Sequence, residues 1–365
     1  MRILITGGAG FLGSQLAFHL RERHEVVAMD NLVRRGSELN LKLFRRHGIA
    51  FAHGDVRSPE DFGNLVGSFD LMIDASAQPS LVYGYANPVF DITNNTMGLV
   101  NALEFARRSG CPIIFCSTNR VYSADRVNAF PVKALATRLV WDKDKIGRAT
   151  HAGFDPDHGF SESFSLDGGQ HGIYGLSKVM ADLACQEYAH AFGLKTVVNR
   201  FSNLAGPGQF GKSEQGWVTW WALAFHFGFP LEYIGWDGKQ VRDVLFAGDV
   251  CRLIETQIEQ IENISGEVFN IGGGAAHTLS PMEATALLQR KTGRDVPVKV
   301  AAETRTADLG IYITDIRKAE RVLGWQPRIG IEEGFNQIMA WVKENEAELR
   351  ELYVAPGTAE KATAR

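Results

Sequence analysis

Tyr174 and Lys178 are the two residues in this chain whose types and spacing most directly suggest chemistry. They stand four residues apart in the segment YGLSK, so on a helix both side chains project from one face. A tyrosine with an ordinary pKa of about 10 is a poor base at neutral pH, but a nearby ammonium group stabilises its phenolate. Such a phenolate can take the proton from a hydroxyl group while a hydride leaves the same carbon. Tyr/Lys pairs also occur on ordinary surface helices, so this interpretation requires a hydride acceptor nearby.

A glycine-rich turn near the N-terminus provides the site for such an acceptor. An apolar strand pattern at residues 2–6 leads into the sequence GGAGFLG, and an amphipathic helix pattern follows it. In this order of strand, turn and helix, Gly7 allows a tight turn, Gly10 lets the backbone approach a pyrophosphate, and Gly13 allows close helix packing. The start of the helix offers free N–H groups to the phosphates. The segment therefore predicts a dinucleotide site.

Charged residues after the second strand pattern indicate which dinucleotide binds. Asp30 ends the pattern at residues 25–30, where a carboxylate accepts hydrogen bonds from the adenosine ribose. It would also repel a ribose 2′-phosphate, so NAD is favoured over NADP. Arg34 and Arg35 follow closely and are the feature that would instead accept that phosphate. Asp55, after the third strand pattern, is either an adenine contact or a solvated turn residue.

Thr118 is the candidate that holds the oxygen of the reacting carbon. It follows the strand pattern at residues 112–117, and in an open α/β sheet ligands bind beyond the carboxyl ends of the strands. With Tyr174 and Lys178 it would form a catalytic group in which the positive nicotinamide ring further stabilises the phenolate. The alternative for a single threonine at a strand end is a turn hydrogen bond.

The elements that must position these residues alternate along the first half of the chain. Short, continuously apolar runs separated by helix-length segments are typical of a parallel sheet covered by helices on both faces. They predict an α/β fold: a Rossmann-type doubly wound parallel sheet with a smaller C-terminal substrate-binding region. The runs are residues 2–6, 25–30, 49–54, 71–75, 112–117 and 195–201.

The domain organisation follows from where this pattern stops. We expect residues 1–200 to form the NAD-binding domain, with later segments at about 240–272 returning to it. The irregular, aromatic-rich residues 201–353 are expected mainly to bind substrate. Residues 354–365 have no apolar periodicity and are expected to form a disordered tail.

Composition and charge exclude several classes of partner. The chain has 38 Lys and Arg against 42 Asp and Glu, and no basic block that would neutralise a nucleic-acid backbone. Its most apolar stretch, residues 217–229, is too short to span a bilayer, and the first residues lack a signal-peptide pattern. We therefore expect a cytoplasmic protein without nucleic-acid or membrane partners. Four dispersed cysteines predict buried, reduced thiols and no metal site.

Together these residues resemble the extended short-chain dehydrogenase/reductase superfamily, in its nucleotide-sugar epimerase and dehydratase branch. The resemblance runs from Met1 to about Trp341, and within the branch it is greatest to 2-epimerases of CDP-linked hexoses. QGW and GKQVRDV are more discriminating than the glycine loop. The segments that carry it are DNLVRRG at 30–36, STNRVY at 117–122, QF at 209–210, QGWV at 215–218, GKQVRDVL at 238–245, NIGG at 270–273 and DIRK at 315–318.

The resemblance implies roles for particular residues. Thr118, Tyr174 and Lys178 are implied to be catalytic, with tightly held NAD that cycles between its oxidised and reduced forms. The residues implied to contact NAD are Gly7, Gly10, Phe11, Leu12, Gly13, Asp30, Asn31, Arg35, Asp55, Val56, Ala75, Ala77, Gln78, Asn95, Tyr174 and Lys178. The residues implied to contact a nucleotide-diphosphate sugar substrate are Gln78, Thr118, Asn119, Arg120, Asn203, Gln209, Gln215, Trp217, Val218 and Arg242.

Arg242 is placed by the resemblance against the diphosphate of the substrate. A guanidinium can hold phosphate oxygens through two hydrogen bonds. The structural alternative is an ion pair of Arg242 with the adjacent Asp243 or with a remote carboxylate.

Asn119 and Arg120 separate the possible reactions. Sugar-nucleotide dehydratases typically have Asp-Glu at these positions, because expulsion of the 6-hydroxyl needs an extra acid and base. Neither residue here can serve as a carboxylate acid or base, so dehydration is not expected. The resemblance implies inversion of C2 through a transient 2-keto intermediate. Inversion of C4, an NAD(P)H-dependent reductase and a non-catalytic dinucleotide sensor are the alternatives.

The chain also departs from the family pattern. Ser123 and Ala124 replace a usual Gly-Asp pair, and Ala205 stands where relatives often have Tyr. The loop at residues 79–85, PSLVYGY, lacks an expected Thr pair. Because this loop is expected to border the hexose, the sugar and the nucleobase stay unassigned at this stage.

The family further implies a homodimer or homotetramer assembled through two helices of each chain. The candidate helices are at residues 94–109 and 174–192. Their apolar faces can alternatively belong to the core of a single chain.

Overall fold

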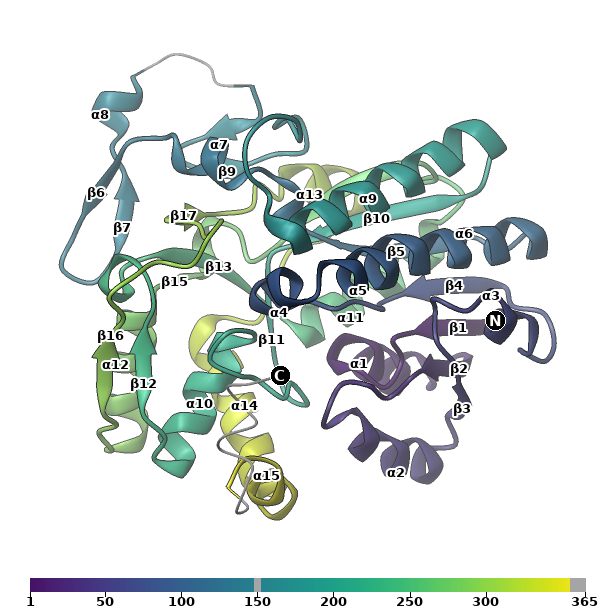
Figure 1. Ribbon diagram of the computed structural model, residues 1–365, viewed down its shortest axis with the longest axis horizontal. Helices are drawn as coiled ribbons and strands as arrows, with labels where there is room; N and C mark the ends of the chain where they lie inside the picture. Colours follow the sequence, from purple (N-terminus) through teal and green to yellow (C-terminus); the bar gives the residue numbers. More distant parts are fainter. Residues whose placement is uncertain (148–151, 355–365) are drawn as a thin grey trace.

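The computed structural model describes residues 1–147 and 152–354, and its centre is a seven-stranded sheet (Figure 1). All neighbouring strands in this sheet are parallel, in the order β14-β10-β5-β4-β1-β2-β3. The strands are β1 (Arg2–Thr6), β2 (Glu25–Asp30), β3 (Ala50–His53), β4 (Leu71–Asp74), β5 (Ile113–Thr118), β10 (Thr196–Phe201) and β14 (Glu267–Ile271). The predicted doubly wound parallel sheet is confirmed.

Helices bury both faces of the sheet, which explains why its strands are continuously apolar. Ile3 and Ile5 of β1 pack in the core on one face, and Leu4 between them packs in the core on the other. The first face is covered by α1 (Phe11–Leu20), α2 (Ser37–His47), α11 (Ala247–Gln260) and α13 (Arg317–Leu323). The second is covered by α3 (Pro59–Gly63), α6 (Gly98–Ser109) and α9 (Gly172–Phe192).

The strand order reverses between β1 and β4, so the chain leaves these two neighbours toward opposite edges of the sheet. In open α/β sheets the crevice at such a reversal, beyond the carboxyl ends of the strands, is where ligands bind. Thr118 is the last residue of β5, next to this crevice.

A second core lies beside that crevice, to the left of the sheet in Figure 1, and is built mainly from residues after 200. Its helices are α10 (Trp217–Phe227), α12 (Pro281–Thr292), α14 (Ile331–Glu344) and α15 (Glu346–Tyr353). Its strands are β11 (Asn203–Ala205), β12 (Leu231–Tyr233), β13 (Val241–Phe246), β15 (Thr278–Leu279), β16 (Val298–Val300) and β17 (Ile311–Tyr312). The chain therefore returns to the Rossmann sheet through α11 and β14, while β13 pairs within the second region.

Residues between β5 and α9 form a third packing unit that the sequence patterns did not predict. Its core combines aliphatic side chains with a cluster of aromatic rings, in which Tyr312 of β17 stacks on Phe160 with ring centroids 5.3 Å apart. The elements are α7 (Ala124–Asn128), β6 (Val132–Ala134), β7 (Leu139–Trp141), α8 (Lys143–Ile146), β8 (Phe154–Asp155) and β9 (Gly159–Phe160). This unit fills the space between α9 and the second region.

Short helices link β4 to α6 along one wall of the crevice. They are α4 (Leu81–Ala86), α5 (Pro88–Ile92) and a π-helical turn (Thr93–Met97). Elsewhere in the described ranges, 3-10 turns occur at Asn119–Val121, Trp236–Gly238 and Ala275–His277. No helix in the described ranges is long and apolar enough to cross a membrane.

The four cysteines, at positions 111, 116, 185 and 251, are buried and free, as expected. The predicted disordered tail lies outside the described residues, except for Val354.

Candidate active site

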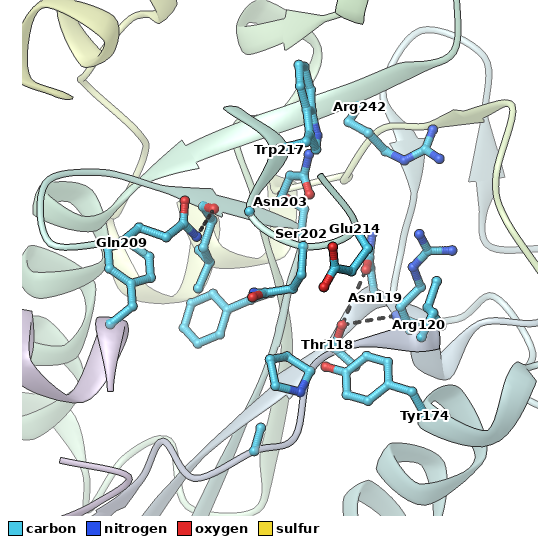
Figure 2. Close-up of a pocket in the computed structure, with 18 of the residues that line it drawn as sticks. Thr118, Asn119, Arg120, Tyr174, Ser202, Asn203, Gln209, Glu214, Trp217 and Arg242 are labelled. Carbon is cyan, nitrogen blue, oxygen red and sulfur yellow. Dashed lines mark hydrogen bonds between the residues drawn. The ribbon is translucent and has the colours of Figure 1, made fainter. Parts of the chain in front are cut away.

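A pocket at the carboxyl ends of β1, β4, β5 and β10 brings most of the candidate residues together (Figure 2). Its lining includes Thr118, Tyr174 and Lys178, which come from β5 and from the first two turns of α9. Figure 2 shows the Tyr174 hydroxyl turned toward Thr118. The Tyr174/Lys178 pair on α9 and the carboxyl end of β5 therefore lie next to each other in the pocket.

Lys178 is held rigidly beneath the pocket. The residue is 1% exposed, and its ammonium group donates a hydrogen bond to the Cys116 carbonyl at 2.9 Å and lies 4.2 Å from the Phe115 ring centroid. Burial lowers the pKa of Lys178, and the negative charge of Asp74 acts against this effect. The end of β5 therefore positions both Lys178 and Thr118.

The electrostatic state of Tyr174 differs from the simple sequence-based expectation. Burial raises the pKa of Tyr174 to about 12, while a hydrogen bond with Thr118 and the positive charge of Arg120 act to lower it. The phenol is therefore protonated at neutral pH in the site formed by the protein alone. A positive charge brought next to it by a ligand would lower its pKa.

A buried network behind the pocket fixes α9 to the sheet. Asp182 of α9 receives hydrogen bonds from Arg200 of β10 at 2.8 and 3.0 Å and from the Ser117 hydroxyl of β5 at 2.7 Å. Arg200 also donates to the Tyr122 hydroxyl at 3.1 Å. These contacts set the register of the helix that carries Tyr174.

The glycine loop has the shape that a pyrophosphate requires. Gly7 has a φ of +63°, and a Cβ atom there would lie 2.7 Å from the Ala75 carbonyl oxygen. A Cβ atom on Gly13 would lie 2.2 Å from the Gly7 carbonyl oxygen, so neither position tolerates a side chain. The helix α1 begins at Phe11 without a side-chain cap or an acidic residue in its first turn. Its first N–H groups are thus available to an anion, and the loop fits a dinucleotide.

Asp30 and Asp55 flank the place where the adenosine is expected. Asp30 accepts hydrogen bonds from the backbone N–H groups of Ala9 at 3.1 Å and Leu32 at 2.8 Å, and burial raises its pKa. Asp55 accepts from Asn31 at 3.0 Å and from Arg57, whose hydrogen bonds are the main reason that the pKa of Asp55 falls to about 2.

The other residues expected near the adenosine have less direct positions. Val56 is 6% exposed and packs against Gly98. Arg35 is exposed, whereas Arg34 lines the pocket and donates a hydrogen bond to the Gln215 side chain. Of these two arginines, Arg34 is the one that lines the pocket, and its guanidinium is already hydrogen-bonded within the protein.

Residues 75–81 form one wall of the pocket, and the residues predicted there either line the pocket or lie behind this wall. Ala75 and Ala77 line the pocket. Gln78 and Asn95 lie behind it: the Gln78 N–H donates to Asn95 Oδ1 at 2.8 Å, and Asn95 Nδ2 donates to Ser177 Oγ at 3.0 Å. Their direct contacts connect this wall to α9.

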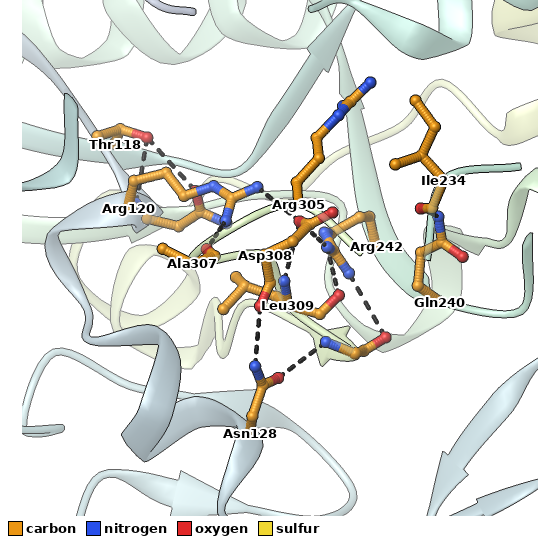
Figure 3. Close-up of polar contacts among 12 residues, drawn as sticks. Thr118, Arg120, Asn128, Ile234, Gln240, Arg242, Arg305, Ala307, Asp308 and Leu309 are labelled. Atoms are coloured by element: carbon orange, nitrogen blue, oxygen red, sulfur yellow. Dashed lines mark hydrogen bonds and ion pairs between the residues drawn. The ribbon is translucent and has the colours of Figure 1, made fainter. Parts of the chain in front are cut away.

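Arg242 forms the remote ion pair that was one of its two predicted alternatives (Figure 3). Its guanidinium donates to Asp308 at 2.9 Å and to the Leu309 carbonyl at 2.5 Å, and burial lowers its pKa to about 10. Arg120 contacts the same Asp308 oxygen at 3.2 Å. Burial alone would raise the pKa of Asp308, but the charges of Arg242 and Arg120 lower it below its usual value. Arg242 still lines the pocket, so it can contact a ligand while it is paired with Asp308.

Most of the residues predicted to bind substrate between β11 and the start of α10 line the pocket, but one does not. Asn203, Gln209, Gln215 and Trp217 line the pocket. Asn203 Nδ2 is buried without a hydrogen-bond partner among the described residues, whereas Gln209 is bonded to Leu204 and Thr219. Val218 is 1% exposed and belongs to the second core, not to the pocket lining. Residues 118–120 lie on one side of the pocket, and Asn203 and Trp217 of this segment lie on the other (Figure 2).

Several charged residues line the pocket in the described part of the chain but were not among the predicted site residues: Arg34, Glu214, Glu232, Arg305 and Asp308. Arg34 was considered only as a ligand for a 2′-phosphate. Asp308 and Arg305 follow β16 in a segment without apolar periodicity or a family-like motif, so no pattern in the sequence indicated them. Arg34 lies within the DNLVRRG segment and Glu214 directly precedes the QGWV segment, but neither was assigned to the substrate site.

Comparisons with known proteins agree with this geometry. Residues 3–272 match the model of the "NAD dependent epimerase/dehydratase family". A CDP-paratose 2-epimerase of Salmonella typhi is 34% identical over 93% of this chain and 99% of its own length. A dTDP-glucose 4,6-dehydratase of Streptomyces venezuelae, solved with NAD and DAU bound, is 26% identical with a TM-score of 0.77, covering 95% and 98% of the two chains. A UDP-glucose 4-epimerase of Thermotoga maritima, solved with UDP-glucose, is 25% identical with a TM-score of 0.73, covering 95% and 100%.

Proposed function

Because the chain belongs to the NAD dependent epimerase/dehydratase family, we propose that it inverts C2 of the hexose of a CDP-linked sugar of the CDP-paratose type. Family membership confirms the resemblance predicted from the sequence and, with it, the expected NAD cofactor. The observation that supports the reaction is the meeting of Thr118, Tyr174 and Lys178 in a pocket that begins at the glycine loop. Hydride transfer needs these groups side by side.

The residues of the pocket divide the work of the proposed reaction. Tyr174, as the phenolate, takes the proton of the 2-hydroxyl, and Thr118 donates a hydrogen bond to the same oxygen. NAD, when bound, supplies the acceptor and later the donor of the hydride. Lys178 keeps a positive charge beneath Tyr174, because its ammonium is anchored on the Cys116 carbonyl. Tyr174 returns the proton after the 2-keto sugar has turned, so no net oxidation occurs.

Cations that line the pocket support a diphosphate anchor. Arg242 and Arg305 both line it, and the buried amide of Asn203 lacks a partner among the described residues. Guanidinium groups hold phosphate oxygens well, and a sugar anchored through its diphosphate can turn without leaving the enzyme. We therefore expect the diphosphate to bind beside Arg305 and the Arg242–Asp308 pair.

The residues beside Thr118 support epimerisation over dehydration. Asn119 Oδ1 lies 3.4 Å from the Thr118 hydroxyl, and Arg120 is bonded to Asp308 and the Ala307 carbonyl. Neither side chain can exchange a proton at neutral pH, so an acid and base pair at these positions is missing.

A 4-epimerase is the second candidate, because the same three residues can oxidise C4 and a relative of this kind shares the fold. Proton NMR of the purified protein with CDP-, UDP- and GDP-hexoses, without added cofactor, separates the two. A manno-type H1 signal from a gluco-type sugar, with deuterium at C2 retained, is the expected result. Inversion at C4 alone, or extensive loss of the C2 label, would falsify C2 inversion by this route.

Assembly of two or four copies through α6 and α9 is the finer proposal about partners. Leu176 and Leu183 of α9, seven residues apart and so on one face of the helix, are 40% and 49% exposed, and Met97 before α6 is 48% exposed, although these helices also bury their other faces. Large exposed apolar side chains gathered on two neighbouring helices favour a protein interface. Light scattering of the purified protein should give a mass of twice or four times 40.2 kDa.

A further inference from the structure

The turn at residues 212–215, above the catalytic end of the pocket, is fixed from two sides. Arg34, in the loop after β2, donates a hydrogen bond to the Gln215 side chain. Arg305, from the segment after β16, donates to the Ser213 carbonyl at 2.9 Å. The backbones of the first and last residues of the turn are also bonded to each other at 2.8 and 3.1 Å. The one residue between Ser213 and Gln215 therefore has a defined direction.

That residue is Glu214, and its side chain enters the pocket. Figure 2 shows its carboxylate turned toward the part of the pocket that holds Thr118 and Tyr174. Its only hydrogen bond within the described part of the chain comes from the neighbouring Ser213 hydroxyl, at 3.2 Å, and no cation of that part lies within ion-pair distance. The carboxylate thus retains most of its capacity to accept hydrogen bonds.

We propose that Glu214 is a further substrate-contacting residue, whose carboxylate accepts a hydrogen bond from a hexose hydroxyl other than the one deprotonated by Tyr174. The inference rests on the proposed function, because it takes the ligand to be a nucleotide sugar. A carboxylate at neutral pH only accepts hydrogen bonds, so its partner must be a donor, and the hexose end of the ligand carries hydroxyl donors. The reacting hydroxyl is already assigned to Tyr174 and Thr118.

The position of Glu214 also bears on the choice of reaction. It supplies a carboxylate that the residues after Thr118 do not. Expulsion of the 6-hydroxyl needs both an acid and a base, however, and a single carboxylate does not provide the pair. Glu214 therefore orients the sugar in this proposal and does not change the reaction.

The test compares binding of CDP with binding of CDP-glucose, measured by isothermal titration of the protein as purified. Glu214→Ala should weaken CDP-glucose about tenfold or more, as expected for loss of a hydrogen bond to a charged group, and leave CDP within about twofold. Glu214→Gln keeps the shape and a neutral acceptor, so its loss should be smaller. Glu348→Gln, which removes an exposed carboxylate on α15, is the charge-matched control and should change neither ligand.

Equal losses for CDP and CDP-glucose in Glu214→Ala, or no loss for either, would overturn the proposal. If wild type prefers another nucleotide, the same comparison is made with UDP and UDP-glucose or GDP and GDP-glucose. Binding does not depend on turnover, so a protein that inverts C4 fails the proposed function while the result for Glu214 stands. Failure of wild type to bind any nucleotide sugar overturns the proposed function itself.

Discussion

The guanidinium of Arg34 and the side-chain oxygen of Gln215 are joined by a hydrogen bond that bridges two regions of the protein. Arg34 lies in the loop that follows Asp30, beside the expected adenosine, and Gln215 lies in the turn over the sugar end of the pocket. We expect a dinucleotide bound at the glycine loop to lie beneath this contact, so that it leaves only when the two loops separate. The contact therefore favours NAD that stays bound through many turnovers.

Replacement of Arg34 by Ala should accelerate loss of NAD. Removing the bond frees the two loops, and we expect NAD to dissociate about tenfold faster, as for loss of one hydrogen bond to a charged group. The measurement is the NAD content of the purified protein after timed dialysis. Arg46→Ala, an exposed arginine on α2, is the control and should retain NAD as wild type does. Equal retention in both variants would show that the bridge does not hold the cofactor.

Replacement of Tyr174 by Phe should leave NAD bound and lower turnover by about 10²–10⁴-fold, the usual contribution of general acid–base catalysis. The change removes one hydroxyl and preserves packing in a residue that is 8% exposed. Tyr188→Phe is the matched control on the same helix, because the Tyr188 hydroxyl bonds Glu104 outside the pocket. A normal rate in the Tyr174→Phe variant would remove Tyr174 from the catalytic role.

Arg242 and Arg305 should respond differently to truncation. Arg242→Ala leaves the buried Asp308 with Arg120 as its remaining ion-pair partner, so we expect a loss of stability approaching the roughly 3–5 kcal/mol of a broken buried pair. Arg305→Ala breaks one bond to a backbone carbonyl and should change the melting temperature little while weakening CDP. Thermal unfolding and CDP titration of both variants check this. A stable Arg242→Ala protein would show that the pair with Asp308 contributes little.

Asp243 should make the protein less stable as the pH rises through about 6. This carboxyl is fully buried on β13, and burial raises its pKa from 3.8 to about 6. Between these two values the folded state holds a proton that the unfolded state has lost, so stability falls as the pH rises from about 4 to 6. The full effect, for a shift of about two units, is up to about 3 kcal/mol. Below about pH 4 the Asp243 carboxyl is protonated in both the folded and the unfolded state, so this loss of stability does not occur there.

Asp243→Asn removes this titration, so its stability relative to wild type should increase from about pH 4.5 to about pH 7.5. Urea unfolding at the two pH values measures the difference. The Gly274 N–H, which donates to Asp243 Oδ2 at 3.2 Å, keeps an acceptor in the variant. Parallel stability profiles for the two proteins would contradict a raised pKa for Asp243.

The sheet could be predicted from the sequence because a parallel strand buried on both faces has an unmistakable apolar run. Ile3, Leu4 and Ile5 pack alternately in two cores, and each is fully buried. The glycine loop could be predicted for a steric reason, since Gly7 and Gly13 stand where no Cβ atom fits. Burial on both faces and lack of space for a Cβ atom both restrict residues that are close in the sequence, so they produce a recognisable local sequence pattern.

The rest of the pocket depends on contacts between distant segments, which leave no such pattern. Arg34 and Gln215 meet across 181 positions, and Arg242 and Asp308 across 66. Sequence reasoning favoured a phosphate contact for Arg242 over an ion pair and did not identify Asp308 as its partner, because Asp308 lies in an irregular segment. The pKa of Tyr174 was likewise inaccessible, since burial, its dominant cause, exists only in the folded protein.

The network of Asp182 with Ser117 and Arg200 has a consequence for the order in which the enzyme matures. A chain that emerges from the ribosome only as far as residue 195 already contains Thr118, Tyr174, Lys178 and the glycine loop. It lacks Arg200, the cation that satisfies the buried Asp182 carboxylate and fixes α9 on the sheet. Since domains fold from the N-terminal side during synthesis, the nascent protein has all its catalytic side chains before it has an active site. The active site therefore cannot be complete before β10 docks, after the last catalytic residue has been made.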